Sequence, residues 1–165
     1  METLAMQLSK RQFLGFSSLA AMGLTFGCGS DAKAKTKFAV TKTDAEWRKV
    51  LSPAAYTVLR KDSTERPYTS PLNKEQRAGT YVCAGCAKPL FSSKTKFESG
   101  TGWPSFYQPL AGGIGTSTDY AIGSARTEVH CSRCGGHLGH VFDDGPKPTG
   151  KRYCMNGVAM KFVAG

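Results

Sequence analysis

The feature that most constrains this chain is a pair of C-x-x-C motifs that lie far apart in the sequence. Cys83 and Cys86 form the first motif, and Cys131 and Cys134 form the second. Two residues between cysteines let both sulfurs of a tight turn face one centre, so four such sulfurs can hold one tetrahedral zinc ion. The intervening residues 87–130 exceed the roughly 15 to 20 residues of a simple zinc ribbon. We therefore expect one structural Zn²⁺ that clamps two distant parts of the fold.

Two other interpretations of the cysteine pairs stay open. The four thiols could form two disulfide bonds, or one pair could be a thioredoxin-like redox motif, which expects a β-α-β context that neither pair has. In the zinc interpretation, Gly85 and Gly135 would supply the backbone freedom that each turn needs.

Chain length and charge narrow the class of protein. The chain has 165 residues, 40% of them hydrophobic, which is enough for one domain with its own core but short for two. A net charge of +10 at pH 7 could indicate a polyanionic partner, but the basic residues are scattered singly. We therefore expect a monomer with no nucleic-acid partner.

Residues 1–30 have the pattern of a signal segment, disordered or helical. Lys10 and Arg11 precede a largely apolar run that is shorter than the about 20 residues of a membrane span. Lys10-Arg11 resembles a twin-arginine export signal with lysine in the first position, and Cys28 resembles a lipoprotein cleavage site. We expect export to the bacterial periplasm or a membrane-tethered place in the envelope, with the signal or a lipid on Cys28 as the only membrane contact. A disordered apolar leader is the alternative.

A flexible linker and then two short helices should follow the signal segment. Residues 31–43 are rich in Lys, Ala and Thr and have little to bury, so order should begin near Asp44 and one domain should span residues 44–165. Thr43 or Asp44 can cap the first helix, and Ser52 followed by proline starts the second. The apolar residues expected on the buried sides are Trp47, Val50 and Leu51, then Tyr56, Val58 and Leu59.

The rest of the chain has the pattern of a mainly β fold. Short apolar runs alternate with turn residues, and the chain contains 19 glycines. The strands predicted from these runs are residues 80–83, 120–125, 128–131, 140–142, 152–156 and 158–162. The predicted fold class is therefore mainly β, with antiparallel sheets around a core stapled by a Cys₄ zinc site and with short N-terminal helices.

Cys154 stands apart from the metal motifs and is the candidate nucleophile. A cysteine attacks as the thiolate, so its ordinary pKa of about 8.5 must be lowered, or its proton relayed, by neighbouring groups. Alternate residues of a strand share a face, so Arg152, Cys154 and Asn156 should project together while Tyr153 and Met155 face the core. The alternative is a buried, inert thiol.

Two histidines and one tryptophan could complete a site around this thiol. His137 and His140 flank Gly139, where a kink could redirect an imidazole into a cleft as a proton donor. Packing of His137 on Cys134 is the alternative. Trp103 lies in a Gly-Thr-Gly-Trp-Pro loop that could expose its indole as a binding wall, although an aromatic residue in such a loop is more often a packing residue.

The ordered set of these motifs resembles the methionine-R-sulfoxide reductases of the B type. The resemblance covers about residues 46–162 and is carried by the first cysteine pair and by residues 99–106, 137–146 and 152–156. It implies an antiparallel β fold with a structural zinc, with Cys154 as the nucleophile. The other residues it implies are His137, His140, Arg152 and Asn156 for catalysis and Trp103, Phe106 and Phe142 for substrate binding.

The resemblance also implies a reaction that repairs oxidative damage. Attack of the Cys154 thiolate on the sulfoxide sulfur of an oxidised protein or peptide would release methionine and leave a sulfenic acid. Many members of the family carry a resolving cysteine where this chain has Thr101, so we expect an external thiol or a thioredoxin-like protein to reduce the sulfenic acid directly. Cys28 is an alternative resolving thiol. Gly157 is a second departure, because the family usually has serine after the asparagine.

Two other classes of protein share part of this pattern. A zinc-ribbon-like binding module would use the same metal scaffold and the basic surface, but it leaves Cys154 without a role. A thiol enzyme that reduces peroxides would attack oxygen instead of sulfur, and Trp103 and the histidines suit that reaction less well.

Overall fold

The computed structural model describes residues 38–165. The predicted signal segment, Cys28 and residues 31–37 of the predicted linker lie outside the described residues. No helix in the described range combines the length and the hydropathy that a membrane span requires.

The described part of the predicted linker lies against the folded body. The backbone N–H of Val40 donates to the carbonyl oxygen of Arg133 at 3.0 Å, and the Phe38 ring packs edge-on against His130 with 5.7 Å between ring centroids. Contacts with the body thus begin before Asp44, because the apolar side chains of Phe38 and Val40 are stabilised when they are removed from water.

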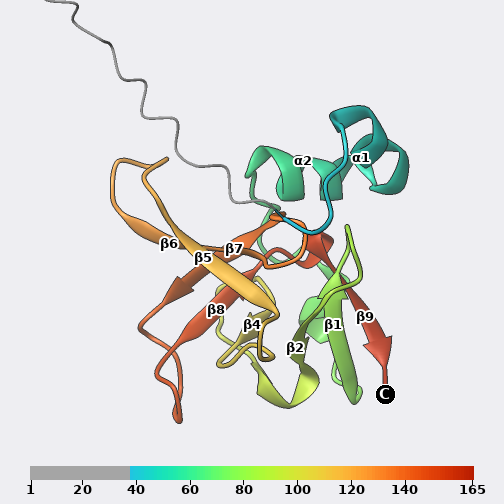
Figure 1. The fold of residues 1–165 in the computed structure, drawn as a ribbon. Helices are drawn as coiled ribbons and strands as arrows, with labels where there is room; N and C mark the ends of the chain where they lie inside the picture. Colours follow the sequence, from blue (N-terminus) through green and yellow to red (C-terminus); the bar gives the residue numbers. More distant parts are fainter. Residues whose placement is uncertain (1–37) are drawn as a thin grey trace, which may run out of the picture. The chain divides into compact units, whose positions relative to one another are not determined.

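Helix α1 (Asp44–Val50) begins with a capping box. The Thr43 hydroxyl accepts from the backbone N–H of Glu46, and the Glu46 carboxylate accepts from the backbone N–H of Thr43 at 2.7 Å. Trp47 and Leu51 are buried as predicted. Val50 is instead 54% exposed, because α1 is short and is the outermost element at its end of the fold (Figure 1).

Helix α2 (Pro53–Lys61) starts where the sequence predicts and covers one end of the strands. The Ser52 hydroxyl accepts from the backbone N–H of Ala55 at 3.2 Å, and Asp62 ends the helix with a positive φ of 53°. Its buried residues include Tyr56, Val58 and Leu59, as expected. This face packs against strand β7 (His137–Phe142) and the short 3₁₀ segment η3 (Gly157–Ala159).

The strands form two antiparallel sheets (Figure 1). The three-stranded sheet has the order β2-β1-β9, and the six-stranded sheet has the order β3-β4-β8-β7-β6-β5. The strand bounds in chain order are β1 Gly79–Cys83, β2 Pro89–Ser92, β3 Lys96–Phe97, β4 Ser105–Phe106, β5 Ile114–Asp119, β6 Arg126–Cys131, β7 His137–Phe142, β8 Arg152–Met155 and β9 Met160–Ala164. Two more 3₁₀ segments are η1 Pro71–Lys74 and η2 Ser93–Thr95. The predicted fold class, mainly antiparallel β with short N-terminal helices, is confirmed.

One predicted strand is wrong. Residues 120–125 form the turn between β5 and β6, in which the Asp119 carboxylate accepts from the backbone N–H of Ala121 and Gly123 has a φ of 81°. The apolar Tyr120 and Ile122 made the turn look like a strand, although both are exposed. The preceding strand β5 was missed because its sequence, Ile-Gly-Thr-Ser-Thr-Asp, lacks apolar alternation.

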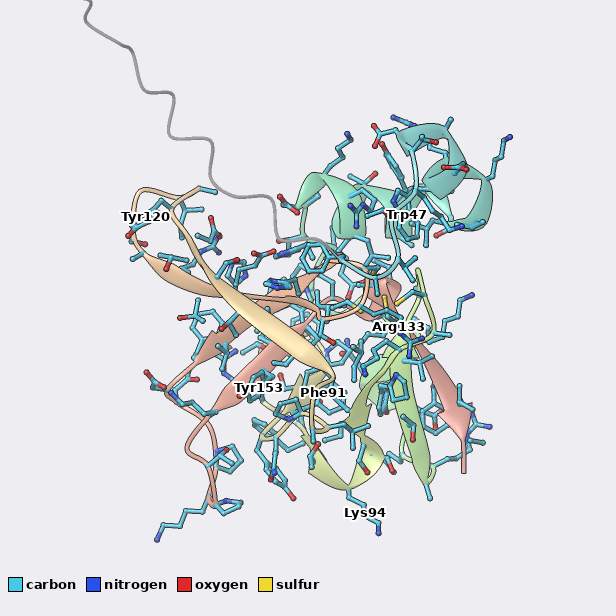
Figure 2. All side chains as sticks on the ribbon, in the orientation of Figure 1. Trp47, Phe91, Lys94, Tyr120, Arg133 and Tyr153 are labelled. Carbon is cyan, nitrogen blue, oxygen red and sulfur yellow. The ribbon has the colours of Figure 1, made fainter. Side chains whose placement is uncertain are left out.

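An aromatic core lies between the two sheets. Phe106 of the larger sheet stacks on Phe91 of the smaller one with 4.4 Å between ring centroids, and it meets Tyr81 edge-on at 4.9 Å. Tyr153 of β8 contacts Phe91 at 5.8 Å, near the centre of Figure 2. One face of the six-stranded sheet is therefore committed to the core, and the opposite face is free to carry chemistry.

Candidate active site and metal centre

The four cysteines of the two motifs meet at one point. Cys83 ends β1 in the smaller sheet and Cys131 ends β6 in the larger sheet, while Cys86 and Cys134 follow in the adjoining turns. The sulfurs of Cys83 and Cys134 lie 3.7 Å apart and those of Cys86 and Cys131 lie 3.5 Å apart. The cluster therefore joins the two sheets, as the long spacing between the motifs predicted.

Both cysteine turns use the same backbone geometry. The residue after the second cysteine, Ala87 or Gly135, donates its N–H to the carbonyl of the first cysteine at 2.8 or 2.9 Å. Its φ is 56° in Ala87 and 66° in Gly135. The freedom expected of Gly85 is thus needed one position after each pair. At Gly85 a Cβ would instead lie 3.3 Å from the Trp47 ring, which is a tight contact, so the glycine leaves room for that ring.

The geometry fits a tetrahedral metal ion better than disulfides. A tetrahedron of sulfurs around zinc at 2.3 Å has edges of about 3.8 Å, close to the two separations observed. All five cysteines among residues 38–165 are free thiols. Hydrogen bonds from Cys134, the larger cause, and from Cys83 lower the pKa of Cys131 to about 2. Hydrogen bonds with the other cysteines, mainly with Cys131, raise the pKa of Cys83. Four thiolates this close can ionise together only around a cation.

The register of the six-stranded sheet places Cys154 in a row of polar residues. Cys154 of β8 pairs with Ser105 of β4 on one side and with His140 of β7 on the other. Beyond His140 the row continues through Glu128 of β6 to Ser117 of β5. Directly paired residues project from the same face, so five strands present one continuous polar row. Met155 has no exposed surface and lies on the core side, as predicted for the neighbours of Cys154.

Burial and two polar neighbours act in opposite directions on the Cys154 thiol. Burial raises its pKa above the usual value, while a hydrogen bond from Thr101 and the positive charge of Arg152 lower it in part. The resting thiol therefore holds its proton at neutral pH, so the site must move that proton when substrate is bound.

A chain of hydroxyl groups runs beside the sulfur. The Thr101 hydroxyl lies 3.8 Å from the Cys154 sulfur, and the Ser99 hydroxyl lies 2.8 Å from Thr101 and 2.7 Å from Ser105. Thr101 thus occupies the position from which a second thiol could reach Cys154.

A β-bulge brings the two histidines together. Residues three apart on a regular strand point to opposite faces, but the pairing shifts between Val129 and His130, opposite this part of β7. The rings of His137 and His140 consequently meet edge-on with 5.4 Å between centroids. The kink expected at Gly139 coincides with this irregularity, and a Cβ there would collide with the Cys154 carbonyl.

Each imidazole is held by a carboxylate from the β5–β6 hairpin. Nδ1 of His137 lies 2.9 Å from Glu128, and Nε2 of His140 lies 2.7 Å from Asp119, which also accepts from Arg126 at 2.6 Å. Burial lowers the pKa of His140, and the hydrogen bond that the ring donates to Asp119 opposes that shift. A carboxylate on one ring nitrogen fixes the orientation of each imidazole.

Arg152 is fixed beside the thiol by two contacts. Its guanidinium donates two hydrogen bonds to Asp144, both at 2.8 Å, and lies over the Phe142 ring at 4.5 Å. These contacts hold the cation next to Cys154 on the same face of β8.

The opposite side of the site is held together by Glu65. The Trp103 indole N–H donates to the Glu65 carbonyl at 3.0 Å, and the Asn156 side chain accepts from the Glu65 N–H at 2.9 Å. The Glu65 carboxylate in turn accepts from the backbone N–H groups of Gly157 and Val158. Asn156 also donates to the Leu138 carbonyl at 3.1 Å, so it is mainly an anchor that fixes the edge of the site.

Most of the predicted residues line one pocket of about 150 Å³. Those present in its wall are Trp103, His140, Phe142, Cys154 and Asn156, together with Thr64, Arg126 and Gly139. His137 contacts His140 from behind, and Arg152 reaches the site from beside Cys154. Phe106 does not reach the pocket: it has no exposed surface and stacks in the core, because its strand position faces the smaller sheet. Phe106 is therefore a packing residue, which corrects its predicted role in substrate binding.

Sequence reasoning missed the residues that hold the site in place. These are Glu65, Ser99, Ser105, Asp119, Arg126, Glu128 and Asp144. Glu65 and Asp119 act through partners 91 and 21 positions away, whereas the contacts of Arg126, Glu128 and Asp144 span seven to nine positions across a turn. No regular helix or strand spacing marks any of them. The sequence offered only indirect signals, such as an Asp and an Arg at either end of the turn after β5.

Comparison with known proteins gives a consistent result. Residues 51–164 match the model of a family described as the SelR domain. The chain is 55% identical over 126 residues to a protein of Leptospira interrogans named peptide methionine sulfoxide reductase MsrB, covering 76% of this chain and 96% of that protein. Proteins with the same name from Bradyrhizobium diazoefficiens and Methanosarcina barkeri are 53% and 54% identical, over 79% and 75% of this chain and 96% and 88% of their own lengths.

Proposed function

The chain belongs to the SelR family of B-type methionine-R-sulfoxide reductases, and on that premise we propose that Cys154 performs the reduction of the R epimer by direct attack on sulfur. The observation that carries this assignment is the position of the Cys154 thiol in a pocket with His140, Trp103 and Phe142. The two aromatic rings offer an apolar wall to the methyl group, and sulfur–aromatic contact favours the thioether end of the substrate.

The attack transfers oxygen from one sulfur to another. The Cys154 thiolate forms a bond to the sulfoxide sulfur, and the oxygen then passes to the cysteine sulfur as this sulfur–sulfur bond and the bond from oxygen to the methionine sulfur break. The methionine sulfur gains two electrons and the cysteine sulfur loses two. The oxygen, with one proton on it, ends on Cys154 as the sulfenic acid, and methionine leaves. Arg152 stabilises the thiolate as it forms, because its guanidinium is fixed beside Cys154.

His140 is the proton donor in this proposal. It lines the pocket beside Cys154, whereas His137 lies behind it and is 2% exposed. The protonated His140 imidazole donates a proton to the sulfoxide oxygen as negative charge develops there. The proton released by the Cys154 thiol then restores the protonated imidazole. His137 and Glu128 then support the position of His140 through the ring contact.

Trapping the intermediate tests the proposed chemistry. One equivalent of R-methionine sulfoxide, added without reductant, should leave one sulfenic acid on Cys154 that dimedone captures and peptide mass spectrometry locates. The S epimer should leave none, because each sulfoxide epimer needs its own enzyme. Capture on any other described cysteine, or equal capture with both epimers, would contradict the assignment.

Replacement of Asp119 with asparagine should shift the alkaline limb of the pH–activity profile to lower pH. The Asp119 carboxylate raises the pKa of His140 against burial and against the charges of Arg126 and His137, so its loss lowers that pKa further. As the pH rises, His140 then loses its proton at a lower pH than in the wild type, and kcat at about pH 8 should fall roughly tenfold. The measurement is kcat against pH, with exposed Asp143→Asn as the matched control. An alkaline limb that does not move would show that Asp119 has no influence on the proton donor.

A cysteine at position 101 should convert the enzyme to an internal disulfide cycle. The Thr101 hydroxyl lies 3.8 Å from the Cys154 sulfur, so in Thr101→Cys the new thiol can condense with the sulfenic acid. After one turnover without reductant, the variant should lose both thiols to a disulfide, whereas the wild type keeps its sulfenic acid. Ser99→Cys is the control, because Ser99 contacts Thr101 and Ser105 rather than the sulfur. A persistent sulfenic acid in Thr101→Cys would oppose the proposed approach of a second thiol.

The reductant and the metal belong to the same proposal. A single-cysteine cycle, in which an external thiol or a thioredoxin-like protein attacks the Cys154 sulfenic acid, is supported by the absence of another free thiol near Cys154 among residues 38–165. Zinc is the metal we propose for the four clustered thiols, supported by their tetrahedral spacing. It would staple the sheets and take no part in the reaction.

The place of action is proposed from sequence alone. The export signal predicted in residues 1–30 supports a role in the bacterial envelope, where oxidised proteins and peptides would be the substrates. Mass spectrometry of the mature N-terminus would establish whether this segment is cleaved and whether Cys28 carries a lipid.

A further inference from the structure

A second group of side chains able to bind a metal lies apart from the cysteine cluster. Asp62, Glu128 and His137 each offer one ligand atom, and these three atoms lie within 4.8 Å of one another. Asp62 follows the end of α2, Glu128 lies on β6 and His137 begins β7. Helix α2 packs against β7, and β7 pairs with β6 (Figure 1). Tertiary packing thus gathers one imidazole and two carboxylates at one point.

The two carboxylates lie close together without a lysine or arginine partner. Glu128 contacts His137 at 2.9 Å and His130 at 3.8 Å, and it accepts a hydrogen bond from Ser117. Within the described chain, Asp62 forms no ion pair. Like charges this close repel each other. A cation bound between the two carboxylates would replace that repulsion with attraction.

The His137 ring has a nitrogen that its surroundings leave unused. The residue is 2% exposed, and its Nδ1 contacts Glu128. Its Nε2 is buried and has no hydrogen-bond partner among residues 38–165. A neutral imidazole can bind a metal through one nitrogen while the other carries the proton. His137 can therefore act as a metal ligand without losing the ring proton.

The spacing and burial of the three side chains suit a small divalent ion. Neighbouring ligands of an octahedral ion at about 2.1 Å lie about 3 Å apart, close to the 2.9 Å between His137 and Glu128. Asp62 is exposed, so its side chain can move to close the remaining distance. Solvent reaches the group from the Asp62 side, and water can supply the other ligands. One imidazole with two carboxylates suits Mn²⁺ better than a soft ion.

We propose that Asp62, Glu128 and His137 bind a divalent metal ion, for which Mn²⁺ is the probe, and that the bound ion slows the reductase. The second half of this inference rests on the proposed function. The His137 ring packs against the His140 ring at 5.4 Å, and Glu128 holds His137 in that position. An ion bonded to both residues replaces their direct contact, so His140 loses the support behind it. The walls formed by Trp103 and Phe142 are not touched, so kcat falls rather than substrate affinity.

The first test measures binding without turnover. Calorimetric titration of the zinc-loaded protein should show one saturable Mn²⁺ site per chain, and Asp62→Asn should weaken its affinity roughly tenfold or more. Asparagine has nearly the same shape as aspartate and tolerates the positive φ of 53° at this position, so the variant should fold. Asp143→Asn is the matched control, because it removes an exposed carboxylate elsewhere and should bind Mn²⁺ as the wild type does.

The second test measures a single turnover of the R epimer without a thiol reductant, because added thiols bind metals. Saturating Mn²⁺ should lower the maximal rate of the wild type about tenfold and leave the half-saturating substrate concentration unchanged. Without Mn²⁺, Asp62→Asn should react within twofold of the wild type. It should keep that rate at a Mn²⁺ concentration that slows the wild type.

The outcomes separate the two halves of the inference from each other and from the proposed function. No saturable Mn²⁺ binding in the wild type, or equal affinity in Asp62→Asn, would overturn the metal site. Saturable binding with an unchanged rate would overturn the inhibition. A wild type that fails to reduce the R epimer in the absence of Mn²⁺ would refute the proposed function, while the calorimetric result on the metal site would still stand.

Discussion

Replacement of Cys154 with serine is expected to abolish sulfoxide reduction and leave the fold intact. Serine has almost the same shape, but its hydroxyl is a far weaker nucleophile that cannot form a sulfenic acid, so kcat should fall by ~1000-fold or more. The side chain lies on the chemical face of β8 and not in the aromatic core, so the unfolding temperature should change little. The measurement is turnover of R-methionine sulfoxide with dithiothreitol, alongside thermal unfolding.

The control for this variant is Thr101→Ser. It keeps a hydroxyl near the Cys154 sulfur and should retain activity within a few fold. Turnover above about a tenth of the wild-type rate in Cys154→Ser would show that another group performs the attack. Loss of the cooperative unfolding transition would show instead that the thiol is a packing residue.

Removal of the metal is expected to unfold the body. Structural zinc contributes about 10 to 16 kcal/mol in small zinc-finger peptides, which is comparable to the whole stability of about 5 to 15 kcal/mol of a typical domain. Here the four sulfurs join β1 of one sheet to β6 of the other, and no disulfide bond among residues 38–165 could replace them. Chelation, or Cys83→Ser, should abolish the cooperative transition and the β signal in circular dichroism.

Elemental analysis should find one zinc per chain before chelation, and the unfolded product should release four reactive thiols in addition to Cys154. A chelated protein with unchanged circular dichroism and activity would contradict the structural role. Metal-free protein with two disulfides in place of the thiols would favour the alternative pairing considered for the sequence.

The parts of the fold that local chemistry controls could be predicted from sequence. The helix starts at Thr43 and Ser52 follow from capping side chains, and the two cysteine turns follow from the spacing of their thiols. Alternation along β8 correctly separated Cys154 from Met155. The turn at residues 120–125 failed as a prediction because its apolar residues imitate a strand and are exposed.

The sequence alone determined which groups the chain has for chemistry, and from them it predicted four thiols for a metal, a separate thiol for attack, and histidines to move a proton. Only the tertiary structure decided which groups meet that thiol. Strand register placed His140 beside Cys154, a bulge turned His137 to the same side, and Asp119 reached His140 from another strand. These neighbours are set by pairing between strands distant in the chain, and such pairing depends on the packing of the whole sheet rather than on any local pattern.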